Sequence, residues 1–372
     1  MSRPILIVGA GMFGSVMAER IASQLKRPVT VIDKRPHIGG NCWSEIDPET
    51  GIEFHKYGPH IFHTSNKEVW DYISQFTEWN NYQHHGWTRY QGKVYSLPIN
   101  LQTINAFYGK NLSPEQARNF IAAEAAKEQI KEPQNLEEKA VSLIGRPLYE
   151  AFIRGYTIKQ WEKDPRELAP EIITRLPVRF NYNGRYFNDR WEGIPLDGYG
   201  KMFERMLDDP LITVRLNTDW FDIRETVPSE ALVIYTGPID RFFDYRLGNL
   251  EWRTVKFEKI RYDIPDFQGA AIVNCSDADI SYTRTSEYRH FHPERSILGK
   301  TVVFNEYSYF SSNDDDPYYP ISTERNRSMY NSYKKIFIKN VIFGGRLGTY
   351  QYLDMDKAVH NALHDFEALQ WG

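Results

Sequence analysis

The stretch Ile5-Leu6-Ile7-Val8-Gly9-Ala10-Gly11-Met12-Phe13-Gly14 decides the fold of this chain. Its four leading apolar residues predict a buried strand of a parallel sheet. Gly9, Gly11 and Gly14 follow in the spacing GxGxxG. In this pattern the first glycine permits a sharp turn, the second lets the backbone approach a pyrophosphate, and the third lets the next helix pack on the strand. The stretch therefore predicts a dinucleotide-binding unit.

The residues that follow complete this unit. Apolar side chains spaced four apart predict a helix with one buried face, and they are Phe13, Met17, Ile21 and Leu25. A second apolar strand, 29–32, ends at Asp33, where an acidic side chain can accept a ribose hydroxyl of an adenine dinucleotide. The alternative is a structural glycine turn without a ligand, but the complete order of strand, glycines, helix, strand and acid favours binding.

The next loop favours FAD over NAD. The basic pair Lys34 and Arg35 follows Asp33, and Gly39-Gly40-Asn41 comes shortly after it. A second glycine pair predicts another close approach of the backbone to phosphate or flavin. NAD does not require this second approach, whereas the longer reach of FAD does, so we expect FAD.

Composition limits the function further. The 372 residues favour two or three domains. The net charge of −4 gives no electrostatic footprint for nucleic acid. The two cysteines, Cys42 and Cys275, form no disulfide framework and fit a reducing cytoplasm. No apolar run approaches the ~20 residues of a membrane helix, and no signal peptide precedes the first strand, so we expect no membrane contact.

The rest of the chain predicts two further domains around the first. Residues 101–165 show helical patterns, and strands are predicted at 252–258, 270–274, 282–289 and 301–306. Two hairpins are predicted, one at 87–97 and one at 178–188, where Asn183-Gly184 suits a type I′ turn. Near the C-terminus a strand, 341–343, precedes Gly344-Gly345-Arg346 and a helix that Asp354 is placed to cap.

These elements define an α/β fold class, with a Rossmann-like FAD-binding domain, a helical insertion and an antiparallel β-sheet domain. We expect the FAD-binding domain to be discontinuous, formed by 1–75, 195–245 and 315–372. The helical domain for substrate and dimer contacts is 101–165. The antiparallel sheet domain is formed by 76–100, 166–194 and 246–314.

Three histidines, His55, His60 and His63, lie close together in the sequence. Histidine is a common metal ligand. However, no cysteine, aspartate or glutamate lies among them to complete a ligand set. We therefore expect a loop packed on the flavin, with Gly58 permitting close approach, and no metal.

A series of ordered motifs is specific enough to identify a family, and through these motifs the chain resembles bacterial UDP-galactopyranose mutase. The motifs extend nearly from end to end of the chain and are 37–41 (HIGGN), 57–64 (YGPHIFHT), 155–161 (GYTIKQW), 175–180 (RLPVRF), 282–284 (YTR), 317–320 (PYYP) and 345–355 (GRLGTYQYLDM). The resemblance implies an FAD enzyme that interconverts UDP-galactopyranose and UDP-galactofuranose, for cell-surface polysaccharides, without net redox change. It implies that reduced flavin attacks the anomeric carbon through N5, with NADPH or NADH as reductant. It also implies a homodimer.

The resemblance assigns residues to this chemistry. The uridine end would contact Phe152, Tyr156, Thr157 and Trp161. Arg175 and Arg284 would bind the pyrophosphate, since a guanidinium fork suits phosphate. Tyr186, Tyr319 and Tyr352 would direct hydroxyls at the phosphates, and Asn274 would reach the sugar. The implied catalytic set is Arg284, Arg175, His63 and Tyr352. The cofactor set is Gly9, Gly11, Phe13, Gly14, Asp33, Lys34, Gly40, Asn41, His60, Ile61, Trp220, Gly345, Arg346, Leu353, Asp354 and Met355.

Without the resemblance, the spacing of Phe152 and Tyr156 predicts an ordinary helix core. At one position the chain departs from the family pattern, because His84 stands where familiar members carry an asparagine near the uridine or sugar. We expect His84 to alter fine substrate contacts and not the reaction class. Two other functions remain open: an FAD-dependent amine oxidase or desaturase-like oxidoreductase, and a non-catalytic nucleotide-sugar binder. The paired arginines, Arg175 and Arg284, favour the mutase.

Overall fold

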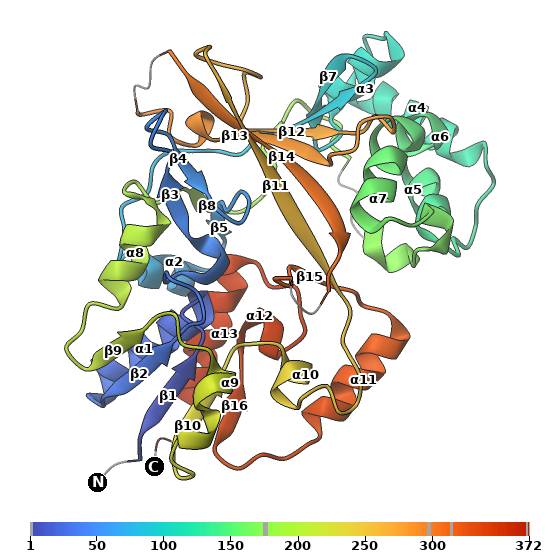
Figure 1. The fold of residues 1–372 in the computed structure, drawn as a ribbon. Coiled ribbons are helices and arrows are strands. Elements are labelled where there is room, and N and C mark those ends of the chain that lie inside the picture. The colour runs from blue at the N-terminus through green and yellow to red at the C-terminus, as the bar shows by residue number, and fades with distance from the viewer. Residues whose placement is uncertain (1–2, 174–177, 296–298, 313–314, 370, 372) are drawn as a thin grey trace.

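The computed structural model describes residues 3–173, 178–295, 299–312, 315–369 and 371. Figure 1 shows two lobes, one built on a parallel sheet near both ends of the chain and one built on a long twisted sheet, with a group of helices attached to the second. No helix among the described residues is both long and apolar enough to cross a membrane.

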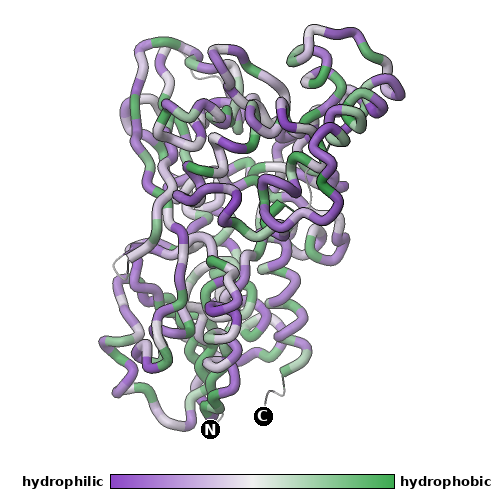
Figure 2. The backbone as a smooth tube through the Cα atoms, turned by 90° about the vertical axis from the view of Figure 1, so that its right-hand side faces the viewer, coloured by the Kyte–Doolittle hydropathy of each residue, from purple (hydrophilic) through white to green (hydrophobic). Residues whose placement is uncertain are grey.

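The first lobe contains a five-stranded parallel sheet that draws on the whole chain. Its strands, in spatial order, are β16 (Val341–Phe343), β10 (Leu232–Tyr235), β1 (Ile5–Val8), β2 (Val29–Ile32) and β9 (Ile212–Arg215). All four pairings are parallel, which confirms the Rossmann-like fold predicted from the glycine motif. Figure 2 shows hydrophobic residues concentrated along the backbone in this part of the molecule.

Alternating residues bury both faces of this sheet. Ile7 and Val31 pack into one core with α1 (Met12–Leu25) and α13 (Met355–Ala368). Leu6 and Val8 face the other core, which contains Trp220. Further helices contribute residues to these two cores or to a third, neighbouring cluster, and they are α2 (Lys67–Ile73), α8 (Gly198–Met206), α9 (Trp220–Ile223), α10 (Ile239–Phe242), α11 (Glu324–Lys334) and α12 (Gly345–Gly348).

The second lobe is a seven-stranded, mostly antiparallel sheet, which confirms the antiparallel sheet predicted from four strands of the sequence. In spatial order its strands are β15 (Tyr319–Pro320), β11 (Trp252–Tyr262), β14 (Thr301–Phe310), β13 (Arg284–Glu287), β12 (Ile272–Cys275), β6 (Gly86–Tyr90) and β7 (Lys93–Leu97). Every pairing is antiparallel except that of β12 with β6. Two small ribbons join the lobes, β3 (Ser44–Ile46) with β4 (Glu53–His55) and β5 (Phe62–Thr64) with β8 (Trp191–Gly193).

The helical part has a separate core. Its elements are α3 (Leu101–Tyr108), α4 (Pro114–Ala126), α5 (Leu136–Ile144), α6 (Arg146–Tyr149), the π-helical turn η2 (Glu150–Arg154) and α7 (Gly155–Trp161). The end of α7 is fixed to the large sheet. Lys159 donates to the carbonyls of Cys275 and Asp277 at 2.7 and 2.9 Å, and Arg253 pairs with Glu162 at 2.7 Å.

The predicted hairpin at 178–188 is wrong. Neither Asn183 nor Gly184 has the positive φ that a type I′ turn requires. Arg179 bridges to Asn100, and Arg185 bridges to His85, so the two segments pair with other parts of the chain and not with each other. The prediction for the helix cap also fails in detail, because Asp354 holds the N-cap position of α13 but its side chain makes no cap hydrogen bond.

Candidate functional site

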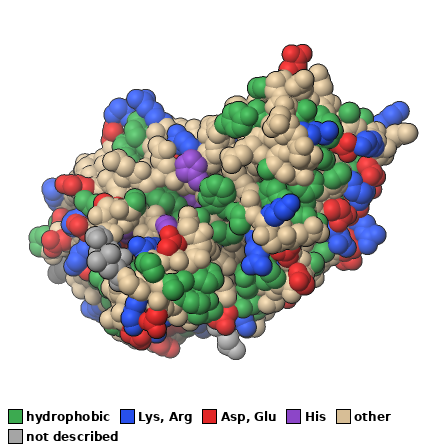
Figure 3. Space-filling model, turned by 90° about the horizontal axis from the view of Figure 1, so that it is seen from above, with side chains coloured by type: hydrophobic (Ala, Val, Ile, Leu, Met, Phe, Trp, Pro, Cys, Tyr) green, Lys and Arg blue, Asp and Glu red, His purple; other side chains and the backbone are tan. Residues whose placement is uncertain are grey.

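A cavity of about 760 Å³ extends between the two sheets. Its walls come from the carboxyl ends of β1, β2 and β10 and the segment that follows β16 on one side, and from β11, β12, β13 and β14 on the other. Ligands of open α/β sheets bind outside the carboxyl ends of the strands, and the cavity has that position. Figure 3 shows, near the middle of one face of the molecule, histidine side chains with acidic and basic groups close by among hydrophobic ones.

The glycine turn at the end of β1 is shaped for a ligand. Gly9 has φ +107°, and a Cβ there would lie 2.0 Å from the Thr236 hydroxyl. A Cβ on Gly14 would lie 2.0 Å from the carbonyl oxygen of Gly9, so these two positions require glycine for the fold. Gly11 differs, because its Cβ would meet only the Cα of Gly40, at 3.9 Å. The protein itself does not require glycine at residue 11, which fits a backbone surface kept bare for the cofactor.

Asp33 holds the next position along the wall. Its carboxylate accepts the backbone N–H groups of Ala10 and Arg35, each at 2.9 Å. Beside it, Lys34 and Arg35 pair with Asp316 at 3.2 and 2.7 Å. These contacts hold the acidic side chain at the rim of the cavity, where the contact with ribose stays a prediction.

Trp220 supplies an independent indication of a ligand. Its indole lines the cavity, and Nε1 is buried with no hydrogen-bond partner in the described part of the chain. Buried donors are normally satisfied. An orphan donor in the cavity wall fits a site that is completed by a bound group.

Every residue of the predicted cofactor set lines this cavity. His60 shows how one of them is held. Its Nδ1 lies 2.7 Å from the carbonyl oxygen of Gly58, and burial, together with the charges of Arg346 and Arg284, lowers the pKa of His60 to about 4. His60 is therefore neutral at physiological pH. The donor set, with its glycine turns and neutral imidazole, fits a flavin dinucleotide.

Three polar side chains from adjacent strands form a row on the opposite wall. Asn274 pairs with Arg284 across β12 and β13, and Arg284 pairs with Glu306 across β13 and β14. Directly paired residues project from the same face of a sheet. The buried Glu306 carboxylate contacts the Arg284 Nε and NH2 atoms at 2.8 and 2.7 Å. Burial alone would lower the pKa of Arg284, but Glu306 raises it well above the usual value, so the guanidinium stays charged.

Tyrosines surround this guanidinium. Tyr156, Tyr186, Tyr319 and Tyr352 all line the cavity. The rings of Tyr319 and Tyr352 stack with their centroids 5.7 Å apart, and Tyr352 is 57% exposed. A half-buried guanidinium and several phenol hydroxyls are groups that suit a phosphate-bearing ligand.

Two histidines, His63 and His84, also line the cavity. His63 contacts Asp189 through Nδ1 at 2.7 Å, and His84 contacts the Tyr82 hydroxyl through Nδ1 at 2.9 Å. Burial, with the charge of Arg284, lowers the pKa of His84 to about 3. His84, which we predicted from a departure in sequence, therefore adds a neutral imidazole to the wall.

Three of the predicted residues that the structure describes do not line the cavity. Phe152 is buried in the helical core, where its ring contacts Tyr95 and Phe107 at centroid distances of 5.1 and 5.3 Å. Thr157 is buried and Trp161 half-buried on α7. Arg175 lies outside the described residues. Their roles stay predictions.

Sequence reasoning missed Glu306 and Asp189, which hold Arg284 and His63. No motif surrounds either acid, and only strand pairing or a close approach reveals it.

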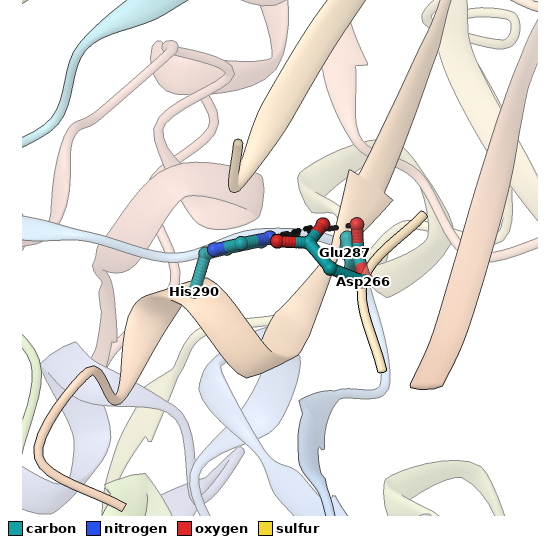
Figure 4. Close-up of side chains that lie close together, drawn as sticks. All are labelled: Asp266, Glu287 and His290. Carbon is teal, nitrogen blue, oxygen red and sulfur yellow. Dashed lines mark hydrogen bonds and ion pairs between the residues drawn. The ribbon is translucent and has the colours of Figure 1, made fainter. Parts of the chain in front are cut away.

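A cluster of possible metal ligands was also not predicted. Asp266, Glu287 and His290 lie together at the base of β13 (Figure 4). The Glu287 carboxylate already accepts hydrogen bonds from the backbone N–H groups of Phe267 and Gln268, each at 2.9 Å, and from the Thr301 hydroxyl at 2.6 Å. None of the three residues lines the cavity. The cluster is a hydrogen-bonded network within the sheet lobe.

The fold and the cavity define a Rossmann-type dinucleotide-binding protein with an arginine and several tyrosines on the wall opposite its glycine turn. Comparison with known families agrees. Residues 7–76 match the NAD(P)-binding Rossmann-like domain, and residues 151–352 match the model of UDP-galactopyranose mutase.

Individual relatives cover nearly the whole chain. A probable UDP-galactopyranose mutase of Klebsiella pneumoniae is 45% identical over 97% of this chain and 93% of its own length. The dTDP-fucopyranose mutase of Escherichia coli is 40% identical over 96% of both chains. The crystal structure of reduced UDP-galactopyranose mutase shares the fold, with a TM-score of 0.70, 15% identity and coverage of 99% and 93%. The chain belongs to the UDP-galactopyranose mutase family, whose flavin-dependent enzymes interconvert pyranose and furanose forms.

Proposed function

We propose that this enzyme interconverts UDP-galactopyranose and UDP-galactofuranose with reduced FAD as cofactor. The observation that carries the proposal is the row of Asn274, Arg284 and Glu306, which faces the same cavity as the glycine turn. This row supports a phosphate-binding role for Arg284 and a sugar-binding role for Asn274, opposite the glycine turn. A redox enzyme acting on amines would not require a half-buried, permanently charged guanidinium there.

FAD would be held by the glycine turn, Asp33 and the Gly345-Arg346 segment. When reduced, it supplies a nucleophilic nitrogen, N5, for the anomeric carbon of the sugar. The protein orients the sugar and stabilises charge on the departing nucleotide through Arg284 and Arg175. NADPH or NADH would serve as reductant.

The remaining roles belong to the substrate. The uracil and its ribose would contact Phe152, Tyr156, Thr157 and Trp161, and the pyrophosphate would accept hydrogen bonds from Tyr186, Tyr319 and Tyr352. Trp161 lies next to Glu162, which Arg253 fixes to the large sheet. A nucleotide bound there would span the junction of the helical and sheet parts.

A second substrate pair has specific support. A relative at 40% identity is a dTDP-fucopyranose mutase, and this family therefore contains members for different nucleotides and sugars. His84 lies at the cavity wall beside Arg284, where a changed side chain alters contacts to the sugar. The dTDP-linked 6-deoxysugar is the second candidate.

We propose a homodimer that uses the helical part, a cytoplasmic location and no nucleic-acid or membrane partner. The two cysteines are buried as free thiols, and burial raises the pKa of Cys42 to about 12, which suits a reducing compartment. Gel filtration with light scattering tests the dimer.

A substrate panel tests the function. Dithionite-reduced enzyme is incubated without oxygen with UDP-galactofuranose, UDP-N-acetylgalactosamine and dTDP-fucopyranose, and the products are separated by chromatography. Conversion of UDP-galactofuranose with the highest kcat/KM supports the proposal. If the enzyme prefers dTDP-fucopyranose, the proposed substrate changes but the proposed reaction class stands. If the enzyme converts none of the three nucleotide sugars, both candidate functions are rejected.

A further inference from the structure

The imidazole of His63 is held from its edge and from its face. Asp189 Oδ2 lies 2.7 Å from Nδ1, and Asp189 Oδ1 accepts the Ser65 hydroxyl at 2.7 Å. Phe187 stacks on the ring, with centroids 3.7 Å apart and an interplanar angle of 14°. His63 lies on β5 opposite Glu192 of β8, so the pairing of these short strands brings Asp189 beside it.

These contacts fix the tautomer. Burial alone would raise the pKa of Asp189, but hydrogen bonds from Ser65 and His63 and the charge of Lys357 lower it, so the carboxylate is ionised at neutral pH. An ionised carboxylate only accepts hydrogen bonds. Nδ1 of His63 must therefore carry the proton, and neutral His63 has its lone pair on Nε2.

The free nitrogen faces the cavity. His63 lines the cavity, and Nε2 has no hydrogen-bond partner within the described ranges of the chain. Nε2 is not fully buried, and because His63 lines the cavity, we infer that this atom is open to the cavity. Charged or titratable groups near this pair are His84, Lys357, Glu192 on the paired strand, and Arg185, which donates to the Asp189 carbonyl at 3.2 Å.

We propose that Asp189 is a positioning residue that makes His63 a proton relay between two oxygens of the sugar. This inference rests on the proposed function. A pyranose ring closes through O5 and a furanose ring through O4. When the first becomes the second, the C1–O5 bond breaks, O5 keeps the bonding pair, and a lone pair of O4 forms the C1–O4 bond.

One proton has to move from O4 to O5 in this conversion. Nε2 accepts it from O4, Asp189 stabilises the resulting imidazolium, and the same Nε2 delivers it to O5. The imidazole ends as it began, and no oxidant or reductant is consumed. The reverse reaction moves the proton the other way through the same atom.

The test exchanges the carboxylate for an amide. In Asp189→Asn the amide can donate to Nδ1, which moves the imidazole proton to Nε2 and blocks acceptance from the sugar. We expect kcat to fall about 10²-fold or more, the range of general acid–base catalysis, while KM changes less than threefold. Asp71→Asn is the matched control, because Asp71 is an exposed carboxylate paired with Lys67 on α2. Ser65→Ala, which keeps the carboxylate, should lose less activity than Asp189→Asn.

A measurement without turnover accompanies the kinetics. Nitrogen-15 NMR of histidine-labelled protein, with the His63 signal assigned by its loss in His63→Gln, should show Nδ1–H in wild type and Nε2–H in Asp189→Asn. Flavin content and melting temperature of each variant show whether it folds, and Ser65→Ala gives a second test if Asp189→Asn does not.

The outcomes separate the two proposals. If the wild-type enzyme converts the substrate and the kcat of Asp189→Asn lies within threefold of the wild-type kcat, the relay alone is overturned. An Nε2–H signal from His63 in the wild-type protein also overturns the relay alone. Absence of any conversion by wild-type enzyme overturns the proposed function and the relay with it.

Discussion

At the residue scale, the pair of Arg284 and Glu306 is the proposed binding group for phosphate. The half-buried guanidinium pairs with the buried Glu306 carboxylate, and Arg284 lines the cavity. We expect Arg284→Ala to reduce kcat/KM by about 30-fold or more, since losing a charge-assisted partner in a buried site costs about 2–5 kcal/mol. Steady-state kinetics and calorimetric titration with UDP measure this loss.

The control for this change is Arg215→Ala, because Arg215 is exposed at the end of β9 and lines no part of the cavity. It should leave kcat/KM within twofold. If both variants retain activity within threefold of wild type, the pyrophosphate role of Arg284 is wrong.

The buried histidines make stability depend on pH. The pKa of His84 is about 3 in the folded protein, below the unfolded value of about 6.5. Above pH 6.5 His84 is neutral in both the folded and the unfolded protein. As the pH falls below 6.5, the imidazole binds a proton in the unfolded chain but stays neutral in the folded protein. His84 therefore removes up to about 1.4 kcal/mol of stability per pH unit between pH 6.5 and 3.

The variant His84→Asn should lose this part of the pH dependence. Urea unfolding at pH 7, 6 and 5 should show the stability of the variant rising relative to wild type as pH falls. His364→Asn on the exposed face of α13 should show no such trend. A difference between wild type and His84→Asn that stays constant with pH would contradict the burial of a neutral imidazole. The same variant should keep the reaction and alter KM or sugar preference modestly.

At the element scale, the turn between β1 and α1 contains glycines with two different roles: Gly14 is required for packing within the protein, and Gly11 leaves room for the cofactor. Gly14→Ala should lower the melting temperature of the cofactor-free protein, because its Cβ meets backbone at 2.0 Å. Gly11→Ala should leave that temperature within about 2 °C and weaken FAD binding at least tenfold, because its Cβ has room in the protein alone. Thermal melts and flavin fluorescence titration give the two readouts. An unchanged FAD affinity for Gly11→Ala would place the pyrophosphate elsewhere.

Elements with strong periodicity were predictable, and those set by distant contacts were not. The strand, glycine turn and helix at the start of the chain agree with the sequence because local packing determines them. The Asn183-Gly184 segment does not, because the Arg179 side chain donates to the Arg185 carbonyl and to Asn188, and these contacts replace a strand ladder. An Asn-Gly dipeptide gives only a local preference for a turn, and contacts with distant residues can override that preference.

The cavity shows the same division. The residues on its glycine-turn side were predictable from the glycine motifs and from the family resemblance, and all of them line the cavity. Glu306 and Asp189 were not, because each acts through a partner that is distant in sequence, 22 residues away for Arg284 and 126 for His63. Pairing of strands, which sequence spacing does not reveal, brings them together.

At the scale of the whole molecule, a complete dinucleotide fold serves a reaction between isomers. Pyranose and furanose forms differ by no electrons, so the enzyme should need reduced flavin without consuming it. We expect oxidised enzyme to retain less than about 1% of the reduced activity, the loss of a nucleophile that contributes at least two orders of magnitude. Anaerobic assays with limiting dithionite, counting product per flavin, measure this.

Product should exceed reductant many times over. The control is aerated enzyme re-reduced with dithionite, which should recover its rate. One reductant consumed per product, or equal rates for oxidised and reduced enzyme, would restore the redox alternative. Denaturation should also release FAD, identified by mass.

The parallel sheet takes its strands from both ends and the middle of the sequence, with β1 at its centre and β16 at its edge. The cavity wall therefore joins Gly9 to Gly345, and the flavin pocket has no complete wall until both are present. On a ribosome, the first cofactor motif emerges more than three hundred residues before its counterpart. Flavin loading must then await nearly the whole translation product, and a nascent chain stalled before β16 should emerge without colour.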